Sequence, residues 1–291
     1  MAGRLQDKVA IVTGGATGIG EAISHKFARE GAKVVVAGLP DDPVQAVVDA
    51  IHAKGGTVTG FLGDLSNEET ALACVRHAVQ KFGRLDVLVN NAGQFPALAE
   101  TQDYPTEDFE RMMRANNYTV FFMTKHALPE LRKTRGNIVT AGSEAGIQGL
   151  ALNTPYGGTK AWNHAFMCGV AVEQAKYGVR ANCVCPGAVD TAWTHKETGP
   201  FNAQVEKMVV QATPMGRRGT PEEIANVYAF IASDEASYMT GSLVCVDGGI
   251  TVSKGAVGEQ VPAEIAEPPK GELELHYSLA GLERKPVHRL I

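Results

Sequence analysis

The sequence predicts an α/β protein built on a doubly wound parallel sheet of about seven strands, folded as a single domain. Short, largely apolar runs alternate with helical patterns from residue 8 to about residue 250. Apolar strands of this kind are typical of a parallel sheet that helices cover on both faces. Glycine is enriched, at 32 of 291 residues against a usual share of ~7%, and many glycines stand beside the apolar runs, where a compact fold needs tight turns.

The apolar runs predict the strands. They are short, mostly rich in β-branched side chains, and separated by stretches with helical periodicity. The expected strands lie at 8–13, 33–37, 57–62, 85–89, 137–140, 179–184 and 242–246.

Helices are expected in the intervals between these strands. The first ends at Gly31. Ser66 and Glu69 predict a capping box that opens a helix running to residue 82, and Thr220, Pro221 and Glu223 combine a cap, a proline at the first helical position and a capping-box glutamate. The remaining helices are expected at 43–54, over a long region between the fourth and fifth strands, and at about 155–177.

The composition of the chain changes after residue 250. We therefore expect one domain over residues 1–250 and an appended extension over residues 251–291. The extension is proline-rich at 261–271 and ends in a short alternating piece at 272–277. That piece is expected either to add a strand to a neighbouring subunit or to cover the mouth of the functional site, and a loosely ordered extension is the alternative.

Composition and charge exclude several classes of protein. With 27 Lys+Arg against 32 Asp+Glu, the net charge of −5 gives no basic excess, so nucleic acid is not expected as a partner. The N-terminus lacks the apolar stretch of a secretory signal, and no apolar run reaches the ~18 residues that span a bilayer. We expect a cytoplasmic protein with no membrane partner, no metal site, and reduced core thiols at Cys74, Cys168, Cys183, Cys185 and Cys245.

A glycine-rich loop follows the first strand and opens the first helix. Its spacing over residues 13–20 is G-x-x-x-G-x-G, which differs from both the common dinucleotide fingerprint and the P-loop. Glycines let the backbone approach a ligand, and the helix N-terminus offers free N–H groups to a pyrophosphate. The sequence therefore predicts a Rossmann-type fold that binds a dinucleotide.

This loop resembles the signature of the short-chain dehydrogenase/reductase family, and further motifs follow in the family's order between residues 8 and 250. Asn90, Asn91, Ala92 and Gly93 match the family's NNAG motif, and Tyr156 with Lys160 matches its YxxxK pair. The remaining matches are Asp64, Leu65, Asn116, Ser143, Pro186 and Gly187. The resemblance implies a homotetramer or homodimer that transfers a hydride between a nicotinamide coenzyme and a secondary alcohol or ketone.

The resemblance also implies the residues of the two sites. The expected catalytic residues are Asn116, Ser143, Tyr156 and Lys160, with Asn117 as a one-residue alternative to Asn116. The expected coenzyme-binding residues are Gly14, Thr17, Gly18, Ile19, Gly20, Leu39, Asp64, Leu65, Asn91, Ala92, Gly93, Tyr156, Lys160, Pro186, Gly187, Val189 and Thr191.

The spacing of Tyr156 and Lys160 indicates acid–base chemistry independently of the family resemblance. Residues four apart lie on one face of a helix. A free phenol has a pKa near ~10, and a cation within ~4–6 Å lowers it by favouring the phenolate. Tyr156 is therefore expected to take a proton from an alcohol or return it to a developing alkoxide, while Ser143, at a strand end, binds the same oxygen.

The choice between NAD and NADP depends on the residues after the second strand. The position that is usually acidic in NAD enzymes is Gly38, and Leu39 is not the arginine expected for NADP. Asp41 and Asp42 would repel a 2′-phosphate at short range. We therefore favour NAD, with NADP as the alternative.

Substrate recognition is less strongly encoded. Gln94, Glu144 and Asn153 are polar residues beside strand ends, and the segment 189–215 resembles a lid that carries Trp193. With Ser143 and Tyr156 these residues are the expected substrate contacts, and they favour a sugar or polyol. A more apolar ketone or steroid-like substrate, and a non-catalytic dinucleotide sensor, are the alternatives.

Overall fold

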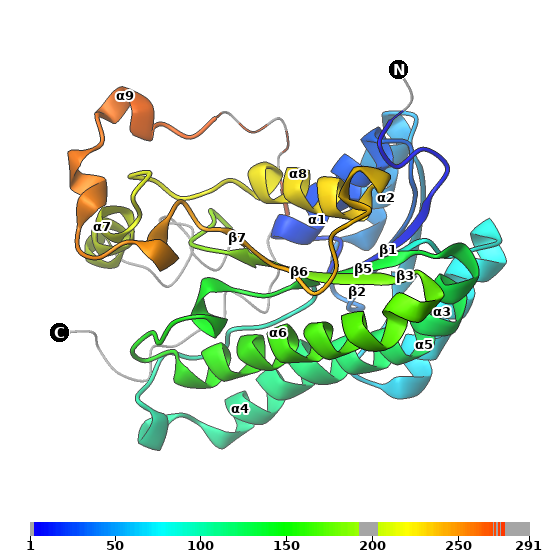
Figure 1. The fold of residues 1–291 in the computed structure, drawn as a ribbon, viewed down its shortest axis with the longest axis horizontal. Helices are drawn as coiled ribbons and strands as arrows, with labels where there is room; N and C mark the ends of the chain where they lie inside the picture. Colours follow the sequence, from blue (N-terminus) through cyan, green and yellow to red (C-terminus); the bar gives the residue numbers. More distant parts are fainter. Residues whose placement is uncertain (1–2, 192–202, 270, 272, 274, 277–291) are drawn as a thin grey trace.

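The computed structural model describes residues 3–191, 203–269, 271, 273, 275 and 276, and it confirms the α/β class (Figure 1). Seven parallel strands form one sheet in the order β3-β2-β1-β4-β5-β6-β7. Their bounds are β1 (Val9–Thr13), β2 (Lys33–Gly38), β3 (Thr57–Leu62), β4 (Val87–Asn90), β5 (Asn137–Ala141), β6 (Arg180–Pro186) and β7 (Leu243–Val246). This is a Rossmann-type order, in which the chain starts at a central strand, builds outward to one edge and then returns to build the other half.

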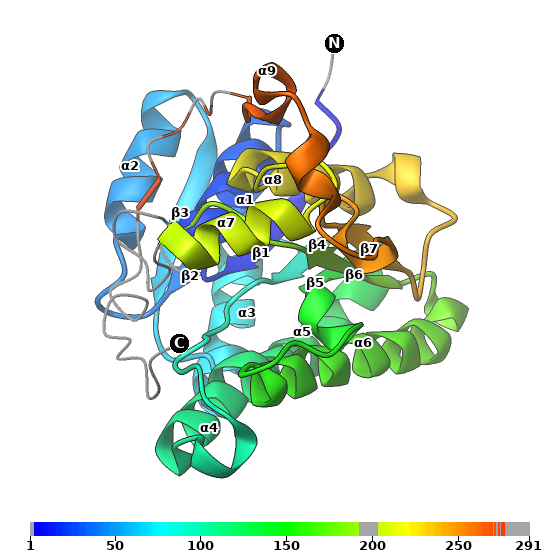
Figure 2. The same cartoon turned by 90° about the vertical axis from the view of Figure 1, so that its left-hand side faces the viewer.

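Helices cover both faces of the sheet (Figures 1 and 2). Helices α1, α2 and α8 pack on one face, and α3, α5 and α6 pack on the other. The helices of the described chain are α1 (Gly18–Arg29), α2 (Val44–Ala53), α3 (Glu68–Phe82), α4 (Thr106–Met113), α5 (Thr119–Thr134), α6 (Thr154–Gln174), α7 (Ala203–Ala212), α8 (Pro221–Ala232) and α9 (Ala263–Ala266).

Alternate residues of each central strand enter opposite halves of the core. On β1, Val12 packs with Phe27 and Ile231 in one cluster, whereas Ile11 packs with Leu131 in the other. All of these side chains are fully buried. The period-2 geometry of a strand explains why β1 is apolar throughout rather than alternating.

One predicted helix start is confirmed and the other is wrong. Thr220 and Glu223 form the expected capping box at α8. At α3, however, Asn67 caps the helix by accepting hydrogen bonds from the backbone N–H groups of Glu69 and Thr70 at 3.0 and 3.2 Å. Ser66 instead donates its backbone N–H to Asp64 Oδ1 at 2.9 Å, which places it one residue before the cap.

The cysteines differ more than the sequence suggested. All five are free. Cys74, Cys183 and Cys185 are buried, but Cys168 is half-buried and Cys245 is exposed, so the prediction of a core thiol is wrong for Cys245. Cys245 lies on the edge strand β7, on the same side as exposed Leu243; in the single chain the described helices leave that side uncovered.

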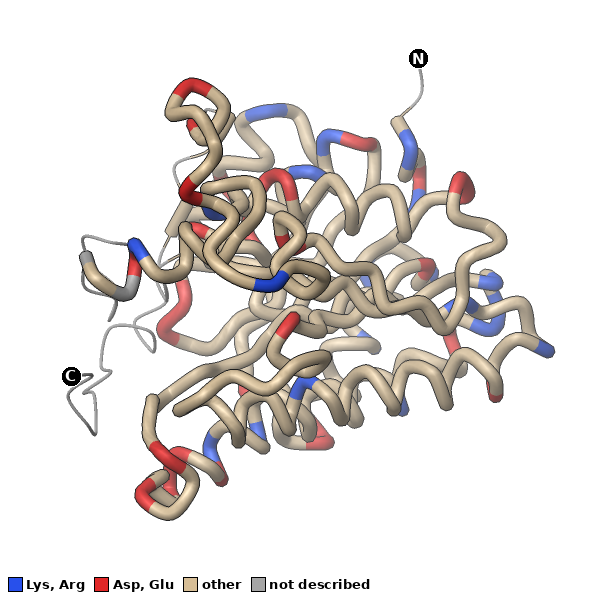
Figure 3. Tube along the Cα trace, turned by 60° about the vertical axis from the view of Figure 1, so that its left-hand side comes forward, with Lys and Arg blue, Asp and Glu red and all other residues tan. Residues whose placement is uncertain are grey.

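Charge is dispersed over the described chain. Lys and Arg are interspersed with Asp and Glu along the trace (Figure 3). None of the described helices combines the length and apolarity that crossing a membrane requires. The division into a domain of residues 1–250 and an extension stays a prediction.

Candidate active site

A cavity of about 990 Å³ lies at the carboxyl ends of the strands. Strands β1 and β4 are neighbours, and the sheet order reverses between them, which is the switch point where doubly wound sheets bind their ligands. The loops after both strands line the cavity, together with residues that follow β2, β3, β5 and β6.

Thr13 ties the two loops of the switch point together. Its Oγ1 donates to the Val89 carbonyl at 3.2 Å and accepts from the backbone N–H groups of Asn91 and Ala92, both at 3.0 Å. The Asn91 amide donates in return to the carbonyls of Thr13 and Gly14 at 3.2 and 3.3 Å. These hydrogen bonds therefore hold the glycine loop and the NNAG loop against each other.

The glycine loop fits a dinucleotide. Gly14 and Gly18 have positive φ angles of 59° and 53°, a conformation that glycine adopts at little cost. A Cβ at Gly20 would lie 1.9 Å from the Gly14 carbonyl oxygen, so the loop closes tightly on the start of α1. The first N–H groups of that helix lack intrahelical partners. The His276 carbonyl accepts the Gly18 N–H at 3.1 Å, and the N–H groups of Ile19 and Gly20, which follow it, suit a diphosphate.

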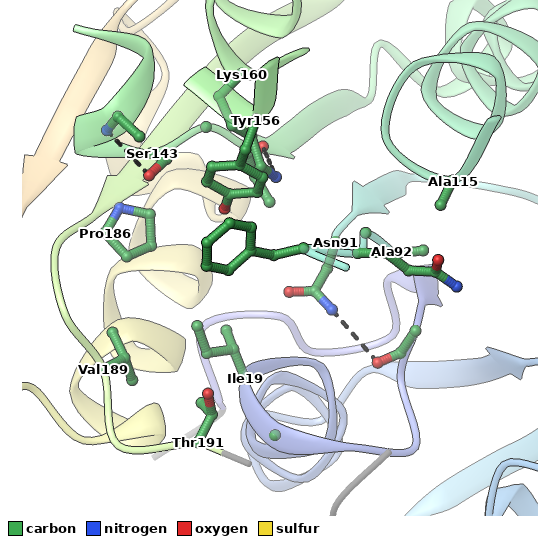
Figure 4. Close-up of a pocket in the computed structure, with 18 of the residues that line it drawn as sticks. Ile19, Asn91, Ala92, Ala115, Ser143, Tyr156, Lys160, Pro186, Val189 and Thr191 are labelled. Atoms are coloured by element: carbon green, nitrogen blue, oxygen red, sulfur yellow. Dashed lines mark hydrogen bonds between the residues drawn. The ribbon is translucent and has the colours of Figure 1, made fainter. Parts of the chain in front are cut away.

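The structure brings the predicted coenzyme residues together. All of them line the cavity except Gly20, which packs beneath the loop. Figure 4 shows Ile19, Asn91 and Thr191 around the same space as Tyr156. Gly38 and Asp42, which the sequence links only to the choice of coenzyme, also line it. Coenzyme binding by these residues stays a prediction.

Lys160 is a buried cation beneath Tyr156. Its side chain is 4% exposed, and its Nζ donates to the Ala141 carbonyl at 3.0 Å. The same Nζ lies 5.6 Å from the centre of the Tyr156 ring, as the four-residue spacing predicted. Burial lowers the pKa of Lys160 to about 8, so the ammonium form still predominates at neutral pH.

Asn116 is buried in a π-helical turn, Arg114–Tyr118, between α4 and α5. Its Oδ1 accepts from the Gln94 N–H at 2.6 Å, and its Nδ2 donates to the Gln94 carbonyl and to Thr159 Oγ1, both at 3.0 Å. Asn117 points elsewhere and donates to the Thr159 carbonyl at 2.9 Å. Asn116 lies outside the residues that line the cavity and holds the loop after β4 against α6.

Ser143 is positioned by a histidine that sequence reasoning missed. Ser143 lines the cavity, and its Oγ accepts from the Ala145 N–H at 3.1 Å. Behind it, Nε2 of buried His164 accepts the Ser143 N–H at 3.4 Å and lies 3.3 Å from Cys185 Sγ. A Cβ at Gly142 would lie 2.4 Å from this Nε2, so the loop wraps directly on the imidazole.

The imidazole of His164 stays neutral. Burial and then the charge of Lys160 lower the pKa of His164 below its ordinary value. A neutral ring with Nε2 unprotonated is the form that accepts the Ser143 N–H. No sequence motif identifies this contact, because residues 143 and 164 come from different elements.

Most of the predicted substrate residues lie in this cavity. Gln94, Glu144 and Asn153 all line it, whereas Trp193 lies outside the described residues. Burial, with a smaller effect of Asp247, raises the pKa of Glu144 to about 7. Helix α7, within the predicted lid, contributes Gln204, Met208, Val209 and Ala212 to the wall. In the part of the chain that the structure describes, no three His, Cys, Asp or Glu side chains cluster as a metal site would require.

A tyrosine over a buried lysine, beside a serine and a glycine-lined cleft, defines a dehydrogenase/reductase class of site. The family model described as enoyl-(acyl carrier protein) reductase matches residues 14–251. The chain belongs to the short-chain dehydrogenase/reductase family, and it is an NAD(P)-dependent oxidoreductase that acts on CH–OH groups.

Similar proteins include sugar and steroid dehydrogenases. L-fucose dehydrogenase from Bos taurus is 35% identical over 272 residues, covering 92% of this chain and 99% of its own. L-rhamnose 1-dehydrogenase (NAD(P)(+)) from Sphingomonas sp. (strain SKA58) is 35% identical over 252 residues, covering 86% of this chain and 98% of its own. The structure of a 7α-hydroxysteroid dehydrogenase complexed with NADH and 7-oxo glycochenodeoxycholic acid is 34% identical, with a TM-score of 0.79 over 84% of this chain and 95% of its own.

The role of His164 is testable by substitution. We expect His164→Ala to lower kcat about 10- to 100-fold, because a displacement of the Ser143 hydroxyl of about 1 Å misplaces it relative to the substrate oxygen. His164→Gln, which keeps an acceptor, should retain more of the activity than His164→Ala. Coenzyme affinity should not change in either variant.

Steady-state kinetics with both substrates varied, together with coenzyme titrations, measure these quantities. His126→Ala is the matched control, because half-buried His126 contacts Glu68 at 3.2 Å and does not line the cavity. Wild-type kcat in His164→Ala would contradict the positioning role.

Proposed function

We propose that this enzyme oxidises a secondary hydroxyl of a small polyhydroxylated substrate, a sugar or a polyol, with NAD⁺. One observation carries the proposal. Three polar residues, Gln94, Glu144 and Asn153, line the same cavity as Ser143 and Tyr156. A few polar groups on the wall of a cavity fix the orientation of a ligand, and the amide and carboxyl groups of these residues suit substrate hydroxyl groups.

The protein's own groups handle the proton of the reaction. The Tyr156 phenolate takes the proton of the substrate hydroxyl, and the Ser143 hydroxyl donates a hydrogen bond to the same oxygen. The Lys160 ammonium, 5.6 Å from the Tyr156 ring, stabilises the phenolate. When bound, the nicotinamide supplies the acceptor for the hydride from the substrate carbon. In reduction, the proton returns from Tyr156 to the forming alcohol.

Coenzyme recognition at the adenosine end favours NAD. Gly38, Leu39 and Asp42 line that part of the cavity. Asp42 Oδ2 accepts the Leu39 N–H at 2.8 Å, so the carboxyl group is fixed at the end of β2. An acidic group there suits ribose hydroxyls and repels a 2′-phosphate. The relative from Sphingomonas is named for both coenzymes, and the structural neighbour holds NADH.

An apolar ketone or steroid-like substrate is the second candidate. Phe95 is buried against Tyr156, with ring centroids 5.0 Å apart, and Leu150 and Met208 add apolar surface to the same cavity. The similarity to a 7α-hydroxysteroid dehydrogenase supports this alternative.

We further propose that the enzyme is a homodimer or homotetramer. Tyr118 at the end of the π-helical turn, Phe121 on α5 and Trp162 on α6 are exposed. Aromatic contacts make the patch continuous: Phe166 lies 6.0 Å from Phe121 and 4.6 Å from Trp162 between ring centroids. An aromatic patch of this kind is typical of a surface that another subunit covers. The cytoplasmic location stays a prediction.

The coenzyme proposal predicts the effect of Leu39→Arg. A guanidinium at the end of β2 attracts a 2′-phosphate, so the ratio of kcat/KM with NADP⁺ to kcat/KM with NAD⁺ should rise about tenfold, which is ~1.4 kcal/mol. Kinetics with both coenzymes at a saturating alcohol concentration measure the ratio. An unchanged ratio would show that residue 39 does not face the ribose.

The substrate proposal predicts that Glu144→Leu and Asn153→Leu impair the oxidation of sugars selectively. Loss of a buried hydroxyl contact should lower kcat/KM for a hydroxylated substrate about 100-fold or more, but should leave a simple secondary alcohol nearly unaffected. A panel of aldoses, polyols, steroids and monohydric alcohols tests this by absorbance of the reduced coenzyme. The matched control is Glu107→Gln, because Glu107 is an exposed carboxylate on the same cavity wall.

Glu144 should also give the reaction a pH dependence. Because the pKa of Glu144 is raised to about 7, kcat/KM for a sugar should rise as the pH rises through 7 in the wild type, where the carboxylate that accepts the substrate hydroxyl forms. Glu144→Gln should lose that step.

The raised pKa of Glu144 also affects stability. The folded state binds more protons than the unfolded state between pH 4.5 and 7, so the contribution of Glu144 to stability falls as the pH rises through that window. Activity confined to steroids and apolar ketones would overturn the substrate proposal.

A further inference from the structure

The described part of the C-terminal segment, residues 257–269, 271, 273, 275 and 276, contacts the rest of the chain at three places. The first contact is with helix α7. A Cβ at Gly258 would lie 2.3 Å from the Val210 carbonyl oxygen and 2.4 Å from that of Thr213, so the backbone of this segment lies directly on the end of α7. Gln211 also donates a hydrogen bond to Glu259. Helix α7 lines the cavity, and the segment is therefore anchored to that wall.

The second contact is with helix α8 and with the apolar cluster to which α1 and α8 contribute. A Cβ at Gly271 would lie 2.7 Å from Glu222 Oε1, in the first turn of α8. Leu273 and Leu275 are partly buried against the apolar cluster that contains Ile23 and Ile224. The alternating leucines thus serve as anchors within this chain.

The third contact is with the first turn of α1, at the glycine loop. The His276 carbonyl accepts the Gly18 N–H at 3.1 Å. His276 Nδ1 lies 2.8 Å from Glu21 Oε1, and its backbone N–H donates to Glu21 Oε2. His276 also lines the cavity, beside Gly14, Thr17 and Gly18.

Glu21 depends on this contact. Its side chain is only 2% exposed, and a buried carboxylate without a partner is strongly unfavourable. Burial raises the pKa of Glu21, and the hydrogen bonds from His276 oppose that rise. His25 lies 4.0 Å away, but burial, then Lys54 and Arg29, lowers its pKa to about 4, so it is neutral at pH 7. His276 is therefore the principal partner of the Glu21 carboxyl group.

We propose that the C-terminal segment is a strap that holds the coenzyme cleft closed, with His276 as a coenzyme-positioning residue and Glu21 as its anchor. The inference rests on the proposed function only in placing a dinucleotide along the glycine loop. The strap joins α7 on one side of the cavity to α1 on the other. It fixes the Gly18 turn before the ligand arrives and adds an imidazole to the wall beside the diphosphate. Preorganisation of this kind lowers the cost of binding, and a strap across the cleft slows release.

The strap predicts a specific change in coenzyme binding. NADH should bind His276→Ala about tenfold more weakly than wild type, mainly through a faster dissociation rate, because a closing contact is lost. The same loss is expected in a chain that ends at Pro269 and carries Glu21→Gln, in which the neutral amide removes the cost of an unpaired buried carboxylate. The KM for the alcohol substrate should change less than twofold in His276→Ala.

The measurement is stopped-flow fluorescence of NADH binding and release, without substrate, on the full chain and its variants. His126→Ala is the control, because it removes an imidazole that pairs with a surface glutamate, Glu68, away from the cleft. Limited proteolysis of the wild type supplies a second readout. Cleavage after residue 257 should slow when NADH is present, and His276→Ala should lose that protection.

Four outcomes separate the strap from the proposed function. Wild-type affinity and dissociation rate in both strap variants would overturn the strap, as would tighter binding, which would mean that the segment competes with the coenzyme. A wild-type chain that binds no NADH would overturn the strap and the proposed coenzyme together. A chain that binds NADH with the predicted strap dependence but oxidises no sugar or polyol would overturn only the proposed substrate.

Discussion

A buried ammonium group beneath a half-buried phenol is the interaction on which the catalytic account depends. Burial of Lys160 is costly, and the Ala141 carbonyl at 3.0 Å provides one compensating hydrogen bond. Burial lowers the pKa of Lys160 only to about 8, so the cation persists at neutral pH. It faces Tyr156 from one helical turn away and can lower the pKa of the phenol. The π-turn that carries Asn116 secures the neighbouring wall by binding both Gln94 and Thr159.

The sheet topology places this pair in the cavity at the switch point of the sheet. Thr13 links the ends of β1 and β4 where the order of the sheet reverses. His164 holds the Ser143 loop from behind, and the C-terminal segment reaches back to the first turn of α1. Residues from the first and last parts of the chain thus meet around one cavity, which the start of α1 and the polar residues Gln94, Glu144 and Asn153 both line.

Much of this arrangement could be predicted from the sequence, because it is local. The strand at 57–62 has the predicted bounds, and the four-residue spacing of Tyr156 and Lys160 gave their shared helix face. Long-range contacts could not be predicted. The cap of α3 moved from Ser66 to Asn67 because both residue types cap helices and Asp64 engages the Ser66 N–H. The contacts of His164 and His276 join residues that are 21 and 255 positions from their partners, a separation that no periodicity records.

The most direct test of the central claim is Tyr156→Phe, assayed both for NADH binding and for turnover. The phenyl ring keeps the packing against Phe95 but has no proton to exchange. The account predicts that kcat falls by about 10²–10⁴-fold while the dissociation constant for NADH stays within about threefold of the wild-type value. A variant that binds NADH and retains wild-type turnover would contradict the account.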